Sequence, residues 1–323
     1  MKRWKKRACL LLTLALMLPT VLALGESTPD AGVHQPAAPE TVLPAFDPAI
    51  DLGYLPEGMA PFILKDSEKG YWVYVTQDLR VEITRYQRTS PSKLVWYIAD
   101  IRSENKAMHT ISYNEEKPGR TNGMPEDMAS AHKAVYAQSG DFYSYRLAND
   151  QRVGIIIRNG EILYDKTYSK TTLALPSLDT VAFFPNGNMQ VFEPYELTAQ
   201  EYLDLGAMDV LSFGPILIRG GEINPVMYTN FTHEEPRNAI GIISPGHYIG
   251  MLVEGRTGYS AGCGLQFMAE TLYDLGCSDA LNLDGGGKAA MLFMGESVEL
   301  GNGDGVQEST RAIPDILAIG THE

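Results

Sequence analysis

Cysteine and histidine are scarce in this sequence of 323 residues, and their scarcity excludes two kinds of site. The six histidines are scattered, and because no His-x-x-x-His pair is present, a zinc hydrolase is not expected. Of the three cysteines, Cys263 and Cys277 flank a predicted helix that would hold them roughly 20 Å apart, beyond the reach of a disulfide. We therefore expect two free, mostly buried thiols. No histidine lies near Cys263 in sequence, so a thiol nucleophile is not favoured.

Positive charge is also in short supply. The chain has 26 Lys and Arg residues against 40 Asp and Glu residues, a formal net charge of −14. Residues 1–25 hold five basic residues and no acidic ones, so their removal would lower the net charge from −14 to −19. An acidic chain without a basic stripe repels nucleic acid and anionic lipid surfaces. We expect neither as a partner.

The five basic residues precede an apolar run over residues 8–24, as in an export signal. Ala23 and Gly25 place small residues at the two positions that a signal peptidase reads. The run is short and contains Pro19, so a retained membrane anchor is the less favoured alternative. We expect a signal peptide at residues 1–25, a secreted or extracytoplasmic protein, and no stable membrane insertion after cleavage.

Composition divides the rest of the chain into three segments. Residues 26–61 are rich in Pro, Ala, Asp and Glu without sustained periodicity, which predicts a flexible spacer. Residues 62–129 are strand-rich, with apolar or alternating runs at 71–76, 80–86 and 93–101. Residues 130–323 complete a single compact domain that is long enough to bury a large core without disulfides.

Hairpins dominate the middle of the chain. Turn residues lie between β-rich runs at Asn159-Gly160, Asn186-Gly187 and Pro245-Gly246. Helices are fewer: Thr198 and Glu201 form a capping box, and a second helix is predicted at residues 264–275. The predicted fold class is α+β, a mostly antiparallel or mixed β-sheet protein with a few covering helices.

The most informative segment is the apolar strand 280–283 and the loop that follows it. Asp284 comes directly after the strand, and Gly285, Gly286 and Gly287 follow it. Glycines let a backbone approach a ligand closely, because no Cβ is in the way. A tight turn in which Asp284 caps the next element is the structural alternative. The carboxylate, the wholly apolar strand and three glycines together favour a functional site.

This segment resembles the signature of the phosphodiester glycosidase family. Motifs similar to those of the family occur here in the family's order: Gly140-Asp-Phe142, Ser212-Phe-Gly-Pro-Ile-Leu217, Arg237-Asn-Ala-Ile-Gly241, Gly255-Arg256, Asn282-Leu-Asp-Gly-Gly-Gly287 and a last strand at 311–319. The similarity covers about residues 130–321. It implies that residues 130–323 form a phosphodiester glycosidase-like domain.

The sequence departs from the family pattern at two places. Lys288-Ala-Ala290 follows the glycines where the family usually has two hydroxyl residues, so a cation replaces hydroxyl donors. Glu254 stands where the family commonly has Asp before Gly-Arg, which keeps the charge and moves the carboxylate by one methylene.

The resemblance implies an exported hydrolase that cleaves the bond between a sugar anomeric carbon and a phosphodiester, in glycan or exopolysaccharide metabolism. Because the phosphate ester leaves as a stable anion, the reaction needs a carboxylate that activates water and groups that hold the phosphate. Candidates for the carboxylate are Asp284, Glu254 and Asp141. Candidates for the phosphate are Arg237, Arg256, Arg311, Lys288 and the amides of Gly285, Gly286 and Gly287.

Two alternatives remain open at this point. Asn302-Gly-Asp304-Gly carries oxygen ligands in a glycine-rich loop, so a Ca²⁺ site is conceivable there, but the spacing is not that of an EF-hand and a turn is the simpler interpretation. No cofactor is otherwise expected. Lys288-Ala-Ala290 also keeps a second function open, a non-catalytic cell-envelope protein that binds glycan phosphates with a decayed site.

Overall fold

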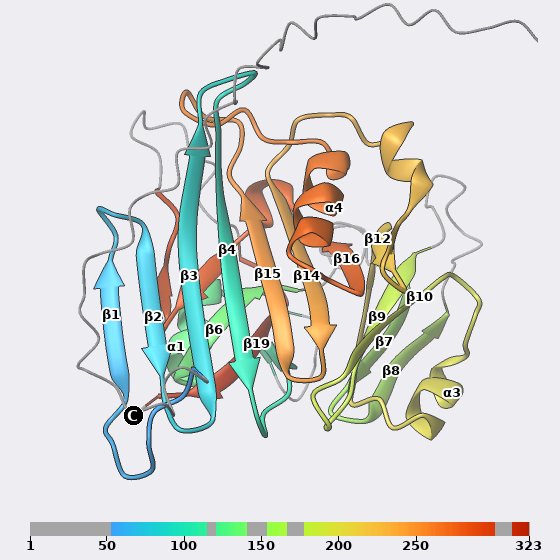
Figure 1. Ribbon diagram of the computed structural model, residues 1–323. Coiled ribbons are helices and arrows are strands. Elements are labelled where there is room, and N and C mark those ends of the chain that lie inside the picture. The colour runs from blue at the N-terminus through green and yellow to red at the C-terminus, as the bar shows by residue number, and fades with distance from the viewer. Residues whose placement is uncertain (1–52, 115–120, 141–153, 167–177, 301–311, 323) are drawn as a thin grey trace, which may run out of the picture. The chain divides into compact units, whose positions relative to one another are not determined.

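The computed structural model describes residues 53–114, 121–140, 154–166, 178–300 and 312–322 (Figure 1). All of them belong to one unit of the chain, Gly32–Glu323. The predicted signal peptide lies outside the described residues, as does the predicted spacer up to residue 52.

The largest sheet joins the N-terminal strands to strands from the second half of the chain. Its order is β1-β2-β3-β4-β15-β14-β16-β12-β13. The strands are β1 (Phe62–Asp66), β2 (Tyr71–Val75), β3 (Leu79–Arg88), β4 (Leu94–Ser103), β12 (Ile216–Arg219), β13 (Glu222–Ile223), β14 (Arg237–Ser244), β15 (His247–Val253) and β16 (Asp279–Leu283). β4 pairs with β15, from Trp96 opposite Val253 to Arg102 opposite His247.

Two smaller sheets have five strands each. One has the order β10-β9-β11-β7-β8, with β7 (Gly154–Arg158), β8 (Glu161–Lys166), β9 (Asp179–Phe183), β10 (Met189–Phe192) and β11 (Asp209–Phe213). The other has the order β18-β17-β6-β19-β5, with β5 (His109–Ser112), β6 (Ala134–Ser139), β17 (Met291–Phe293), β18 (Glu296–Ser297) and β19 (Asp315–Thr321). The described strand pairings are antiparallel, which confirms the predicted α+β class.

The helices cover the outer faces of these sheets. They are α1 (Pro125–Ala131), α3 (Ala199–Asp204) and α4 (Leu265–Asp274), with short 3₁₀ turns at Pro225–Tyr228 and Gly286–Lys288. α4 lies on one face of the nine-stranded sheet, beside β14, β16 and β12 (Figure 1). Leu265, Met268 and Leu272 of α4 are buried in the hydrophobic cluster on that face. Among the described residues, no helix is long and apolar enough to cross a membrane.

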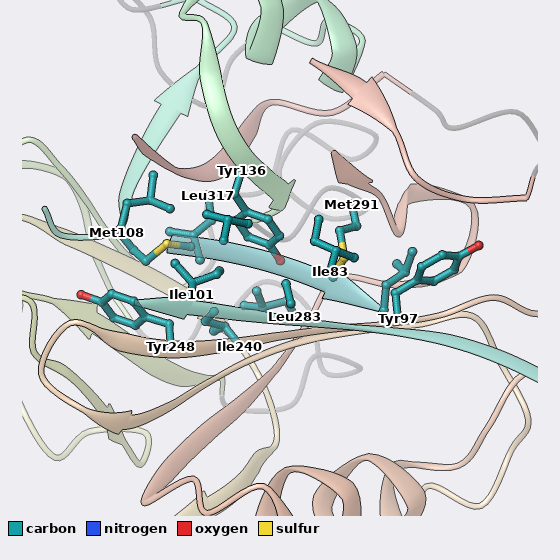
Figure 2. Packing of buried hydrophobic residues seen from close by; sticks show 14 of the residues in the cluster. Ile83, Tyr97, Ile101, Met108, Tyr136, Ile240, Tyr248, Leu283, Met291 and Leu317 are labelled. Carbon is teal, nitrogen blue, oxygen red and sulfur yellow. The ribbon is translucent and has the colours of Figure 1, made fainter. Parts of the chain in front are cut away.

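The main hydrophobic core lies between the nine-stranded sheet and the two smaller sheets. Figure 2 shows Ile83, Ile101 and Ile240 of the large sheet packed with Tyr136 and Leu317 of the sheet that contains β6 and β19. Burial of such side chains stabilises the fold by about 1.5–3 kcal/mol each. The core therefore fixes the positions of the ends of β14, β15 and β16 relative to β6 and β17.

The predicted hairpins and caps are confirmed. β7 and β8 turn at Asn159 and Gly160, which have φ of 50° and 75°, as a tight hairpin turn of mirror-image type requires. β9 and β10 meet across Asn186-Gly187, and β14 and β15 across Pro245-Gly246. The capping box at Thr198 and Glu201 starts α3. Local sequence chemistry thus determines these elements.

Candidate active site

Three predicted site residues lie at one end of three neighbouring strands. β14 lies between β15 and β16, with Arg237 opposite Val253 and Asn238 opposite Leu283. Glu254 follows Val253, and Asp284 follows Leu283, so both carboxylates come directly after strands that flank β14. Two strand spacings place the backbones of Glu254 and Asp284 roughly 10 Å apart. The sheet therefore gathers these residues at one edge.

Asp284 is buried, with 8% of its surface exposed, and its loop is anchored on both sides. Leu283 before it and Met291 after the glycines are fully buried in the same core cluster (Figure 2). At Ala290 the N–H donates to Ser139 Oγ (3.2 Å), and at Ser139 the N–H donates to Ala290 O (3.0 Å). These contacts hold the Asp284 loop in place.

The glycines pack against the backbone where β14 begins. A Cβ on Gly285 would lie 2.6 Å from the carbonyl oxygen of Pro236, so no larger residue fits there without a shift. The same oxygen accepts the N–H of Gly286 (2.9 Å), whose φ of 63° favours glycine. In the described part of the chain, the N–H groups of Gly285 and Gly287 donate to no protein acceptor. They are the loop amides left for an anion.

Arg256 lies beside this loop. A methyl group on Gly286 would be 3.8 Å from Nη2 of Arg256 and 3.9 Å from Nη1. The guanidinium is about half exposed and grips Glu235, with Nε and Nη2 both 2.7 Å from Oε2. Arg256 also has a φ of 61°, a conformation that costs a non-glycine residue about 1–3 kcal/mol and is enriched at functional sites. Sequence reasoning missed Glu235.

Arg237 is held by backbone carbonyls and is more buried. Its Nε donates to the carbonyl oxygen of Cys263 (3.3 Å) and its Nη2 to that of His233 (3.1 Å). Burial lowers the pKa of Arg237, and the neighbouring Arg256 acts in the same direction. Two of its nitrogens therefore fix the loops around the site, and Nη1 has no protein acceptor among the described residues.

Glu254 is buried and its carboxylate accepts three hydrogen bonds. Tyr97 Oη donates to Oε1 (2.7 Å), Tyr259 Oη donates to Oε2 (2.6 Å), and the N–H of Leu300 donates to Oε1 (3.0 Å). Burial raises the pKa of both tyrosines, so their hydroxyls stay protonated donors. With both oxygens occupied, Glu254 is better placed to stabilise positive charge than to take a proton from water. Sequence reasoning missed all three donors.

The structure describes the other predicted site residues only in part or not at all. Asp141 and Arg311 lie outside the described residues, as does the Asn302-Gly-Asp304-Gly loop considered for Ca²⁺. For Lys288 the backbone is described, in the 3₁₀ turn after the glycines, and the side chain is not. Within the described residues, no three His, Cys, Asp or Glu side chains gather in a way that could hold a metal ion.

Two further features of the sequence are structural. Cys263 and Cys277 are free and buried, as predicted, and burial raises the pKa of each thiol to about 12.

Gly258-Tyr-Ser-Ala-Gly262 has the glycine-x-serine-x-glycine spacing of a serine esterase, a match that the sequence reasoning overlooked. Ser260 is fully buried, and its Oγ donates to Glu254 O (2.6 Å) and accepts from Val95 N–H (3.0 Å). Its hydroxyl is therefore a turn contact, since a nucleophile needs exposure.

A protein-family model described as phosphodiester glycosidase matches residues 132–320, which include β14, β15, β16 and the Asp284 loop. This chain belongs to the phosphodiester glycosidase family. The family match covers every predicted site residue, and it supports a glycosidase type of hydrolase.

A curated protein shares part of this sequence. The SPbeta prophage-derived uncharacterized protein YomE of Bacillus subtilis (strain 168) is 28% identical over 175 residues, 53% of this chain and 26% of that protein. The chain thus spans about a quarter of that relative's length.

Two solved structures show the same fold. The catalytic domain of zebrafish N-acetylglucosamine-1-phosphodiester alpha-N-acetylglucosaminidase, auto-inhibited by its pro-peptide, matches with a TM-score of 0.60 and 20% identity, over 76% of this chain and 84% of that one. A hypothetical protein from Synechocystis matches with a TM-score of 0.50 and 12% identity, over 82% and 64% of the two chains.

Proposed function

We propose that this protein is an exported hydrolase that cleaves the bond between a sugar anomeric carbon and a phosphodiester, in glycan or exopolysaccharide metabolism. The observation that carries the proposal is the position of Arg256 over the glycine loop that follows the buried Asp284. A cation beside a carboxylate, with two backbone amides that donate to no acceptor among the described residues, suits a reaction in which a phosphate leaves from a sugar. The name of the zebrafish enzyme with the same fold states a sugar 1-phosphodiester.

In the proposed reaction, water adds to the anomeric carbon and the C1–O bond to phosphate breaks. The proton of water passes to a carboxylate, and the products are the reducing sugar and a phosphate monoester. Asp284 is our choice for that carboxylate. Arg256 and the Gly285 and Gly287 amides would hold the phosphate, while Glu254 would stabilise the positive charge that develops on the sugar.

A screen of the mature chain, residues 26–323, against aryl and alkyl phosphodiesters of common sugar 1-phosphates tests this proposal. Release of reducing sugar by the wild type and its loss in Asp284→Asn would support it. Asp204→Asn, an exposed residue at the end of α3, is the matched control and should keep full activity. No release from any substrate by a folded wild type would contradict the proposal.

Export rests on the sequence of residues 1–25 alone. The test is the N-terminal sequence of the protein recovered from the culture medium or the cell envelope of an expressing cell. A start near Glu26 would support signal cleavage, and an intact N-terminus in the cytoplasm would contradict it.

One observation favours the second candidate, a non-catalytic protein that binds glycan phosphates. Arg256 is already paired with Glu235, so a phosphate ligand would have to compete with a carboxylate for the guanidinium. Calorimetric binding of a sugar 1-phosphodiester without hydrolysis would identify this function. Binding with turnover would exclude it.

A further inference from the structure

A fourth carboxyl group, Glu299, lies next to Glu254. The peptide N–H that joins Glu299 to Leu300 donates to Glu254 Oε1 (3.0 Å). The Glu299 side chain turns back, so that its Oε1 accepts the N–H of Met291 (2.9 Å), and the N–H of Val298 donates to Met291 O (3.1 Å). Residues 291–300 therefore form a hairpin that connects the end of the Asp284 loop to Glu254.

The surroundings of Glu299 are rich in negative charge. The negative charges of Glu254, at the end of β15, and Glu126, in the first turn of α1, both raise the pKa of Glu299. Glu126 Oε2 is buried without a hydrogen-bond partner among the described residues. Among the described residues, Tyr97 on β4 and Tyr259 on the loop after β15 also interact with both glutamates.

Arg85 on β3 acts electrostatically on Tyr97, and its side chain binds elsewhere. Its guanidinium donates to the carbonyl oxygens of Ser67 (2.9 Å) and Glu68 (2.7 Å). Within the described residues, neither Glu254 nor Glu299 has an ion-pair partner. Burial, with help from Glu254 and Glu126, raises the pKa of Glu299 to about 8. At neutral pH Glu299 is therefore protonated.

We propose that Glu254 and Glu299 form a carboxyl pair that carries one negative charge in the active protein. Glu299 is then a positioning residue: its ionisation sets the highest pH at which the Leu300 N–H keeps the Glu254 carboxylate in position. When Glu299 releases its proton to solvent, a second negative charge is added close to that of Glu254. Their repulsion weakens the bond from Leu300 N–H to Glu254. The activity part of this proposal rests on the proposed function, and the stability part does not.

The sign of the stability effect follows from linkage. Above about pH 4.5 the unfolded chain releases the Glu299 proton, while the folded protein keeps it up to about pH 8. The folded state binds more protons in this window, so its stability falls as pH rises through the window and levels off above it. Glutamine at position 299 cannot titrate, and this decline should disappear.

The test compares wild type, Glu299→Gln and the control Glu296→Gln, an exposed residue on β18 whose only described ion pair is with Lys65 (3.0 Å). Thermal unfolding is measured from pH 5 to pH 9 without substrate, and kcat/KM over the same range. We expect wild type and Glu296→Gln to lose kcat/KM about tenfold per pH unit above pH 8. Glu299→Gln should lose less and should show a flatter dependence of Tm on pH.

Identical pH profiles of Tm and kcat/KM in wild type and Glu299→Gln would overturn the carboxyl pair. Different Tm profiles without detectable hydrolysis would leave the pair standing and count against the proposed function instead. If Glu299→Gln does not fold, infrared spectra of the wild type decide: a protonated carboxyl C=O band that disappears with a midpoint near pH 8 supports the pair. Absence of that band at pH 6 overturns it.

Discussion

Two charged clusters join the sheets of this protein, and they are built in opposite ways. At one junction, Arg158 at the end of β7 pairs with Asp315 at the start of β19 (2.8 Å), with side chains 4% and 1% exposed. Arg158 Nη1 also donates to Val210 O (2.7 Å). At the other junction, Glu254 and Glu299 bring two carboxyl groups together, and hydroxyl and amide donors replace the cation.

This difference separates a structural contact from a functional one. In a buried pair of opposite charges each partner compensates the charge of the other, so the pair can have a purely structural role. A buried carboxylate without a cation is retained where its charge has a use, which is why perturbed carboxyls gather at active sites. Variants at the Arg158 cluster should therefore change stability, and variants near Asp284 should change turnover.

The largest expected effect is at the structural cluster. Asp315→Ala leaves the Arg158 guanidinium buried without its carboxylate, and we expect the free energy of unfolding to fall by about 3–5 kcal/mol. Urea denaturation of wild type and variant measures this. The double variant Arg158→Met with Asp315→Leu removes both charges and should recover most of the loss. A loss below about 1 kcal/mol in Asp315→Ala would mean that the pair contributes little.

Asp284→Asn should show the reverse pattern. The change is nearly isosteric and removes the charge, so we expect turnover of a sugar phosphodiester to fall at least about a hundredfold, the low end for acid/base catalysis. Steady-state kinetics and thermal unfolding of the same preparation measure the two effects, and Tm should be little changed. Parallel loss of Tm and activity would show that Asp284 is a structural cap.

Arg256→Lys should have a smaller effect that is selective for phosphate. Lysine keeps the charge and loses the planar two-nitrogen grip, so we expect about a tenfold loss of kcat/KM on a sugar phosphodiester. An uncharged aryl glycoside of the same sugar should be less affected. The matched control is Arg219→Lys, because Arg219, the last residue of β12, is similarly exposed and pairs with Glu196 (2.6 Å).

Arg237→Lys tests whether the selectivity for phosphate belongs to Arg256 alone. Arg237 bonds the carbonyls of Cys263 and His233, so its replacement should reduce turnover of both substrates together by loosening the loops. Selectivity for the phosphodiester in Arg237→Lys, with none in Arg256→Lys, would exchange the roles that we give to the two arginines.

The smallest effect is expected at Lys288. Serine at this position restores the hydroxyl that the family usually has after the glycines, and activity should change by less than about tenfold while the preference among phosphodiesters shifts. Relative kcat/KM over the substrate panel measures the shift. Complete loss of activity in Lys288→Ser would make the lysine essential.

Much of the local fold could be predicted from the sequence. Asn159-Gly160 determines its hairpin because both residues accept positive φ, and Thr198 with Glu201 determines the start of α3 through reciprocal hydrogen bonds. The periodicity of residues 264–275 predicted α4, and the apolar run before Asp284 predicted β16. Each of these signals lies within a few residues of the structure that it determines.

The same holds for the site motifs, whose order along the chain pointed to the family that the comparison confirms. Asp284, Glu254, Arg256 and the glycines were singled out from their residue types and neighbours. Their roles stay predictions until the variants are measured.

The tertiary structure decided the contacts between these motifs. Tyr97 reaches Glu254 from β4, Glu235 holds Arg256, and Glu299 arrives through the β17–β18 hairpin. No local pattern marks these residues, because strand pairing and core burial, which act between distant segments, bring them to the site. The sequence by itself determined which chemical groups are available. Only the packed sheets decided which of them become neighbours, because strand pairing joins distant segments, and burial there removes the water that would otherwise screen their charges.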